Sequence, residues 1–275
     1  MPVNGMGRHL TGILLGATAI LFEACTGLFG GLYDEPEETP KPVIITEEDT
    51  KSDTLLHTVS GLLYIDASSW KDWYYIDLQA IANPQTREQA VTQIGQPYPI
   101  PTTGDDKADR DYGIYTYWFD VWGKGINVYE FRQFKATSAQ PSPDSWSLAV
   151  HRNNVRTNDG GVYETQLTNI DQLSMQKEEL KALPFTTDEW TKNAVWADDS
   201  QMLNSLIGCQ GISINPVLSS WLRLDIPPMP PAFTHNNHVF ILRNNDGTFA
   251  ALQLTNYISP SGIKCCLTIQ YKYPL

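Results

Sequence analysis

The sequence has few of the residues and motifs by which enzymes and metal sites are usually detected. It contains only 4 cysteines among 275 residues, and none of them forms a CxxC pair with zinc-binding spacing. It also contains no GxSxG motif, no glycine-rich phosphate loop and no HExxH motif. We therefore expect a binding protein rather than an enzyme.

Basic residues are scarce as well. The chain has 19 lysines and arginines against 31 aspartates and glutamates, which gives a formal net charge of −12. Proteins that bind nucleic acid contact phosphates through clustered lysine and arginine, so this composition argues against a nucleic-acid partner.

The main hydrophobic run near the start, residues 10–22, is too short to span a bilayer but suits a secretory signal peptide. Ala24 and Cys25 directly follow it and resemble a lipobox, in which the cysteine is lipidated and becomes the first residue of the mature protein. We predict a lipoprotein signal peptide over residues 1–24 and a lipid on Cys25. The alternative is an ordinary secretory signal with an incidental cysteine.

Residues 25–54 are rich in acidic residues and prolines and contain little to bury. Such a segment is expected to stay solvated, as a tether between a lipid anchor and a folded domain. The acidic stretch also resembles the surface-export signal of lipoproteins in some Gram-negative anaerobes. We expect an outer-membrane lipoprotein that faces the cell surface and meets the membrane only through its lipid. Retention in the inner leaflet, shedding and release in vesicles are left open.

Residues 55–275 predict a single antiparallel all-β domain with long loops. Aromatic and β-branched residues recur with partial alternation, and no strand–helix alternation indicates a parallel sheet. Asn245-Asp246-Gly247 predicts a hairpin turn because glycine accepts the positive φ that such turns require. The predicted strands cover residues 59–66, 73–78, 112–121, 126–134, 146–150, 239–242, 249–254 and 266–273.

The same pattern predicts only one helix, over residues 172–183, with Asp171 as its N-cap and Pro184 at its end. Residues 83–111 are expected to form a loop, within an insertion that covers about 83–140.

Two segments carry a resemblance to a known family. Residues 65–78 (IDASSWKDWYYIDL) and 145–158 (SWSLAVHRNNVRTN) are similar to the paired signature of HmuY-like haem-binding lipoproteins. The tail, residues 237–247, 251–257 and 267–274, is similar to the closing hairpins of that family. The chain departs from the family pattern at Ser147, where aspartate is usual, and at Asn153, where tyrosine is usual.

The resemblance implies a haemophore: an all-β domain that binds one haem, takes it from host haemoproteins and delivers it to a TonB-dependent outer-membrane receptor. The runner-up is a surface lipoprotein of the same fold that binds another ligand or a partner protein without haem. The best-known family member ligates iron with two histidines, but here the second falls at Ile226 and no histidine lies near the first. Other members use methionines.

Methionine is rare in the chain, and two of its 5 methionines lie in the predicted signal peptide. Met229 stands in the proline-rich segment 226–231, where a stiff backbone suits an axial haem ligand. Met202, in a polar loop, is its predicted partner on the opposite face of the porphyrin. The alternatives are a packing role for Met229 and a half-buried loop position for Met202. Met175, in the predicted helix, is expected to be core.

The remaining histidines are not predicted to bind a metal. His151 lies among alternating apolar residues and is predicted to bond to neighbouring backbone, whereas His235 and His238 are predicted to be surface residues. Arg152 and Arg156 suit either haem propionates or the many acidic side chains, so neither is assigned.

Overall fold

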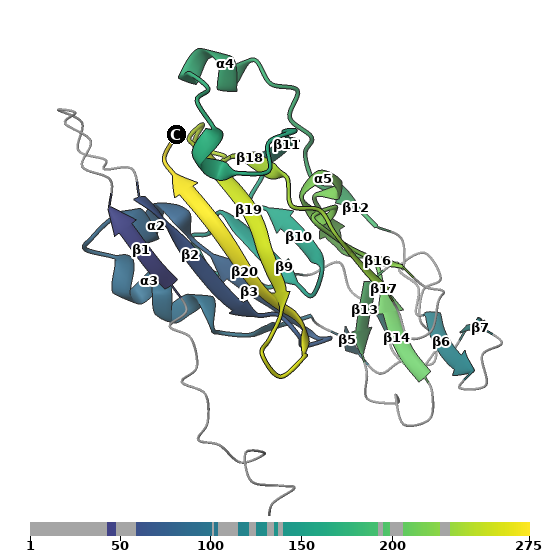
Figure 1. Ribbon diagram of the computed structural model, residues 1–275. Helices are drawn as coiled ribbons and strands as arrows, with labels where there is room; N and C mark the ends of the chain where they lie inside the picture. Colours follow the sequence, from purple (N-terminus) through teal and green to yellow (C-terminus); the bar gives the residue numbers. More distant parts are fainter. Residues whose placement is uncertain are drawn as a thin grey trace, which may run out of the picture. The chain divides into compact units, whose positions relative to one another are not determined.

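Strands dominate the part of the chain that the structure describes, and all the strand pairs there are antiparallel. The computed structural model (Figure 1) describes residues 43–47, 59–100, 102–103, 115–120, 125–130, 135–136, 140–191, 195–198, 206–225 and 232–275. The all-β prediction is therefore confirmed. Met202, Met229, Cys25 and the predicted signal peptide lie outside these residues.

The largest sheet has six strands in the order β1-β2-β20-β19-β18-β11. The predicted hairpin turn joins β18 to β19, where the Gly247 φ is +82° and its N–H donates to the carbonyl of Asn244. A second turn, with Gly262 at φ +86°, joins β19 to β20. The strands are β1 (Val43–Glu47), β2 (Val59–Asp66), β11 (Gly161–Glu164), β18 (Val239–Arg243), β19 (Phe249–Ile258) and β20 (Lys264–Tyr273).

β20 shows how sequence alternation sets the sheet's buried face. Leu267, Ile269, Tyr271 and Tyr273 are each at most 1% exposed, and the residues between them are half-buried. Because successive side chains of a strand point to opposite faces, these positions share one face. Each buried side chain of this size contributes roughly 1.5–3 kcal/mol to stability.

A second sheet has the order β10-β9-β3-β4. One buried cluster contains Ile76, Leu148 and Val155 from this sheet together with side chains of β2, β18, β19 and β20, so the main core lies between the two sheets. The strands are β3 (Asp72–Ile76), β4 (Tyr98–Pro99), β9 (Leu148–His151) and β10 (Asn154–Thr157).

Four smaller strand groups complete the described part of the chain. They are the pair β12-β15, the four-stranded sheet β13-β14-β6-β7, the pair β16-β17 and the pair β5-β8. Their bounds are β5 (Thr102–Thr103), β6 (Tyr115–Asp120), β7 (Gly125–Glu130), β8 (Lys135–Ala136), β12 (Glu189–Trp190), β13 (Val195–Asp198), β14 (Leu206–Gln210), β15 (Ser213–Ile214), β16 (Leu222–Asp225) and β17 (Ala232–His235).

The predicted helix forms, but it is shorter than expected and begins later. Only α4 (Lys177–Lys181) forms within residues 172–183, with Gln176 as its N-cap in a capping box with Glu179. The predicted cap, Asp171, instead lies in the 3-10 helix η1 (Ile170–Gln172), whose cap is Asn169. Met175 consequently lies outside the helix, half-buried against the cluster of Ile170, Leu180 and the last strands.

Two further helices lie where strand or loop was expected. α2 (Leu78–Ala82) begins because the side chain of Asp77 accepts the Ala80 N–H at 2.9 Å, a cap that the sequence analysis took for the end of a strand. α3 (Arg87–Ile94) falls inside the predicted loop 83–111. The buried side chains of Ala90 and Ile94 stabilise it by packing along one of its faces. The remaining helix is α5 (Pro216–Ser219), which starts at the cap Asn215.

Part of the predicted tether joins the large sheet. β1 pairs with β2 over its whole length, from Val43 opposite Leu63 to Glu47 opposite Val59. The apolar run Val43–Ile45 explains the pairing, because Val43 and Ile45 pack against the main core. The folded part therefore begins before residue 55. Among the described residues, none of the helices has the length and hydrophobicity needed to cross a membrane.

Candidate functional site

The two predicted haem ligands lie in connections between paired strands. Met202 belongs to residues 199–205, between β13 and β14, and Met229 to residues 226–231, between β16 and β17. Both connections are outside the described residues, as is Cys25. What the structure describes is how the strands on either side are fixed.

The β16–β17 pair, on either side of Met229, is attached to the core at its base. Trp221 and Leu222 are fully buried, and Leu222 pairs with His235 across the two strands. The His235 imidazole Nε2 lies 2.7 Å from the carbonyl oxygen of Leu254, and the ring of Phe233 packs on Tyr257 in β19. These contacts fix both strands against the six-stranded sheet.

The β13–β14 pair, on either side of Met202, is clamped at its own base. The Thr191 N–H donates to the Ile212 carbonyl at 2.8 Å, and the Ile212 N–H donates to the Thr191 hydroxyl at 3.1 Å. Gly211 permits this approach, since a Cβ there would lie 2.2 Å from the Thr191 carbonyl oxygen. β14 also pairs with β6, which extends the sheet.

Each described histidine already has a protein partner. His151 is fully buried, and its Nδ1 lies 3.0 Å from the Asp72 carbonyl oxygen, which confirms the predicted structural role. His235 and His238 were expected at the surface, but both are half-buried. Besides the contact of His235 with Leu254, His238 Nδ1 lies 2.7 Å from Glu164 Oε1. No group of three or more His, Cys, Asp or Glu side chains that could bind a metal occurs in the described part of the chain.

Arg156 occupies an aromatic pocket on the other side of the second sheet. Its guanidinium carbon lies 4.8 Å from the centroid of Trp73, 5.3 Å from that of Tyr75 and 5.1 Å from that of Trp146. Its NH1 donates to Gln140 at 2.6 Å, and its NH2 donates to the Tyr75 hydroxyl. Arg156 is only 7% exposed, so its described contacts are structural.

The charge of Arg156 faces a partly buried carboxylate. Burial lowers the pKa of Arg156 to about 10, and the charge of Asp188 opposes this shift. Burial likewise raises the pKa of Asp188, although hydrogen bonds from Thr157 and Asn215 counteract it. Arg156 stays charged at neutral pH. Arg152, in contrast, donates to the Ser68 carbonyl at 2.7 Å and stacks on Trp70.

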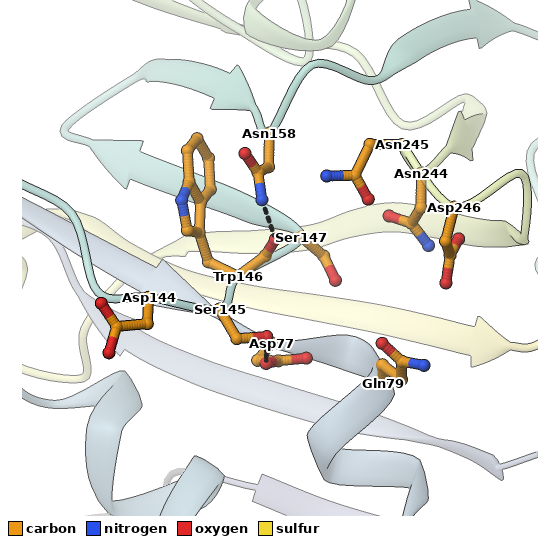
Figure 2. Close-up of a pocket in the computed structure, with 10 residues that line it drawn as sticks. All are labelled: Asp77, Gln79, Asp144, Ser145, Trp146, Ser147, Asn158, Asn244, Asn245 and Asp246. Carbon is orange, nitrogen blue, oxygen red and sulfur yellow. Dashed lines mark hydrogen bonds between the residues drawn. The ribbon is translucent and has the colours of Figure 1, made fainter.

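A polar cavity of about 160 Å³ lies at another place, where α2 starts near the β18–β19 turn (Figure 2). Ser147, one of the two positions at which the chain departs from the family motif, lines it and accepts the Leu78 N–H at 3.1 Å. This cavity was not predicted from the sequence. Its available pointers were the departure at Ser147 and the Asn-Asp-Gly turn. The lining residues are Asp77, Gln79, Asp144, Ser145, Trp146, Ser147, Asn158, Asn244, Asn245 and Asp246.

Comparison with known proteins places the fold in a defined group. The family model described as HmuY protein matches residues 69–271, which is more than half of the chain. No curated protein is similar enough to this chain to match it.

Several solved structures are similar. A Bacteroides fragilis protein described as a lipoprotein is 30% identical, with a TM-score of 0.52, over 82% of this chain and 93% of that one. A Bacteroides vulgatus protein described as HmuY-like and haem-binding is 28% identical, with a TM-score of 0.50, over 78% of this chain and 92% of that one. The apo HmuY analogue of Tannerella forsythia, 21% identical with a TM-score of 0.52, covers 83% of this chain and all of its own, and it shows the fold alone.

Proposed function

The chain belongs to the HmuY family, and from this premise we propose that its β domain binds haem, with Met202 and Met229 as the axial ligands of the iron. The wider role that we propose is that of a haemophore. The protein takes up haem, also from host haemoproteins, and passes it to a TonB-dependent receptor. The haem-binding description of the Bacteroides vulgatus relative supports the ligand.

The observation that carries the methionine assignment is the burial of His151, the histidine within the family motif, whose Nδ1 lies 3.0 Å from the Asp72 carbonyl oxygen. His235 and His238 are half-buried, and each uses one ring nitrogen in a contact with the protein, so the other ring nitrogen makes them the alternatives to test. Met175 is half-buried against the cluster of Ile170 and Leu180. The thioethers of Met202 and Met229 are the ligands that we propose, each in a connection between two paired strands.

Ligation by two thioethers predicts which oxidation state of the haem iron binds more tightly. A thioether sulfur is a soft donor, and soft donors favour ferrous over ferric iron. We therefore expect tighter haem binding after reduction with dithionite.

The test is a haem titration of the purified protein, with and without dithionite, followed in the Soret region. Met202→Ala, Met229→Ala and the double variant should each lose the low-spin ferrous spectrum and bind haem more weakly. Met175→Ala is the matched control, because it removes a thioether that packs on another cluster, and its spectrum should equal that of the wild type.

His238→Ala is the second comparison. A histidine whose Nδ1 contacts a carboxylate resembles a metal-ligating histidine, and the His238 side chain is 29% exposed. Wild-type spectra and affinity in both methionine single variants would refute the bis-methionine site. Loss of the spectrum in Met229→Ala and His238→Ala, but not in Met202→Ala, would replace Met202 with His238.

Anchoring is a separate part of the proposal. We propose that Cys25 carries the lipid and that the protein is exposed at the outer-membrane surface, in agreement with the lipoprotein description of the Bacteroides fragilis relative. Cys25→Ala should move the protein from the membrane fraction to the soluble fraction in cells. Retention of the variant in the membrane would contradict lipidation, and protection of the wild type from protease added to intact cells would contradict surface exposure.

A further inference from the structure

We propose that the β19–β20 turn, residues 259–263, is a membrane-contact site whose tip enters the headgroup layer of a lipid bilayer. This adds a second contact to the one expected through the lipid on Cys25. The proposal rests on the proposed anchor only for the orientation of the domain, because the affinity of the turn for lipid can be measured without the anchor. It does not depend on haem binding, because the turn lies outside the strand pairs that flank Met202 and Met229.

An aliphatic side chain is exposed at the tip of this turn. Ile263 is 48% exposed, one of three large hydrophobic side chains with this property among the described residues, and Pro260 in the same turn is exposed as well. The turn extends past β2, whose pairing with β20 ends at Cys266. A single exposed isoleucine on a flat surface needs no explanation, but one at the end of a hairpin can enter a bilayer interface without the rest of the domain.

The turn pairs its own backbone groups, as a segment that leaves water must. The Ser259 N–H donates to the Ile263 carbonyl at 2.9 Å, and the Gly262 N–H donates to the Ser259 carbonyl at 2.9 Å. The Ile263 N–H donates to the Ser259 hydroxyl oxygen at 3.0 Å, and that oxygen lies 2.8 Å from the Ser261 hydroxyl oxygen. Pro260 has no N–H to pair. Since unpaired backbone groups are costly to bury in lipid, these contacts lower the cost of moving the turn into the interface.

The charge of the hairpin suits an anionic lipid surface. Residues 247–275 contain Lys264 and Lys272 but no aspartate or glutamate, although the whole chain has a net charge of −12. On the neighbouring strand, Asp66 contacts Cys266, two residues farther along β20 than Lys264. Interactions between exposed charges more than about 8 Å apart are largely screened at physiological ionic strength, so the local charge matters more than that of the whole chain.

Lys264 is placed to meet lipid phosphates. It is exposed directly after the turn, and its Nζ lies 5.5 Å from the centroid of the Tyr257 ring. That ring in turn packs on Phe233, with the two centroids 5.9 Å apart. A lysine beside a tyrosine is typical of the headgroup level, where the ammonium group reaches the phosphates and the ring lies at the boundary with the acyl chains.

The register of the six-stranded sheet puts the turn at the end from which the anchor enters. β2 ends at Asp66, opposite Cys266, so the turn follows that end of the sheet. β1 runs antiparallel to β2 and starts at Val43, opposite Leu63, so the chain enters β1 from the same end (Figure 1). Val43 is the eighteenth residue after Cys25, and a segment of this length spans at most about 65 Å. A lipid on Cys25 would therefore keep the turn at a high effective concentration near the bilayer.

Flotation with lipid vesicles tests the proposal. The protein is the purified Cys25→Ala chain, and the vesicles are phosphatidylcholine with about a quarter phosphatidylglycerol, in about 0.15 M salt. We expect part of the protein to float, with a partition coefficient below the roughly 10⁴ M⁻¹ of a myristoyl chain, because the turn buries less apolar surface. Such weak binding does not hold the unlipidated protein on membranes in cells, so the release expected for Cys25→Ala is unaffected. A failure of lipidation would likewise leave the flotation result unchanged.

In this chain, Ile263→Ser should lower the partition coefficient about fivefold and Ile263→Trp should raise it by a similar factor, since the turn's hydrogen bonds use only the backbone of Ile263. Lys264→Gln should lower it about threefold. Ile44→Ser is the matched control, because Ile44 is also 48% exposed but lies within β1, and it should leave the coefficient unchanged. Absence of flotation, an unchanged coefficient in Ile263→Ser, or an equal loss in Ile44→Ser would overturn the proposal. An unchanged coefficient in Lys264→Gln would refute the contribution of charge.

Discussion

Strand β20 and the surroundings of Arg156 both bury titratable side chains. Those of β20 are neutral, whereas Arg156 is charged. Burial raises the pKa of Tyr271 to about 12, and it also raises the pKa values of Tyr273 and Cys265, so these groups are neutral in the core at neutral pH. Arg156 keeps its charge under three aromatic rings, opposite Asp188.

The difference shows where each region depends on specific partners. A neutral buried hydroxyl or thiol costs at most an unmade hydrogen bond, whereas a buried charge requires compensation from all sides. The strands of the six-stranded sheet should therefore tolerate the loss of single polar atoms. The aromatic pocket of the second sheet should not tolerate the loss of its cation.

Replacing the cation should produce the largest effect. Arg156→Ala removes the group that contacts three rings, Tyr75 and Gln140, and it leaves Asp188 without its compensating charge. We expect a loss of about 3 kcal/mol in the free energy of unfolding, measured by urea denaturation.

Arg243→Ala is the control for this substitution. Arg243 stacks on a single ring, Phe185, with its guanidinium carbon 4.8 Å from the ring centroid, and its loss should cost about 1 kcal/mol. Equal losses in the two variants would show that the surroundings of Arg156 are not specially dependent on its charge.

Asp188 should give a smaller loss with a characteristic pH dependence. Its carboxylate accepts the Thr157 N–H at 2.7 Å, the Thr157 hydroxyl and the Asn215 amide. Asp188→Asn places an amide NH₂ group against one of these donors, so we expect a loss of about 2 kcal/mol at neutral pH.

The pH dependence follows from the raised pKa of Asp188. The folded state binds the proton more tightly than the unfolded chain, so the wild type loses stability as the pH rises from 3.8 through the folded-state pKa. The variant lacks this contribution. The stability gap between the two proteins should therefore be wider at low pH and narrow as the pH rises, as measured by urea denaturation at several pH values. A gap that widens with rising pH would contradict the assignment.

Two neighbouring tyrosines of β20 test the neutral region. The Tyr271 hydroxyl is buried without a hydrogen-bond partner among the described residues, while the Tyr273 hydroxyl lies 3.2 Å from the Thr248 hydroxyl. Tyr271→Phe should therefore raise the free energy of unfolding by about 1 kcal/mol, and Tyr273→Phe should lower it by about as much. Destabilisation by both substitutions would mean that Tyr271 has a partner.

Four strands of the six-stranded sheet, β2, β18, β19 and β20, could be predicted because their information is local, whereas β1 and β11 were not predicted. β20 alternates, and Gly247 and Gly262, each with a positive φ, mark the β18–β19 turn and the β19–β20 turn. α3 was missed because only Ala90 and Ile94 among its residues are buried, which leaves almost no apolar periodicity to detect. Its position depends on packing with β3, which a local pattern does not encode.

The polar sites were less predictable than the fold for a related reason. The contact of Arg156 with Tyr75 and the contact of Ser147 with Leu78 each join segments far apart in the sequence, and they depend on the register of β3 with β9. The sequence identified these residues as unusual or chemically useful. Their hydrogen-bond partners follow only from the way β3 and β9 are paired in the folded sheet.

The smallest effect is expected for the alkylation rate of Cys266. It tests what keeps the Cys266 thiol neutral at the edge of the core. Burial, followed by the charge of Asp66, raises the pKa of Cys266 to about 11, and its sulfur lies 3.6 Å from Asp66 Oδ1. Because only the thiolate reacts with iodoacetamide, a shift of two pH units lowers the reactive fraction near pH 8 by about a hundredfold. Asp66→Asn removes the charge but not the burial, so the pKa should fall only part of the way toward 9.0 and alkylation should speed up several-fold.

The rate is measured at Cys266 by fragment mass spectrometry across pH 7 to about 11. Asp171→Asn, which changes a distant carboxylate, should leave it unchanged. A wild-type rate that already levels off near pH 9, or an Asp66→Asn rate equal to the wild type, would show that Asp66 does not contribute to keeping this thiol neutral.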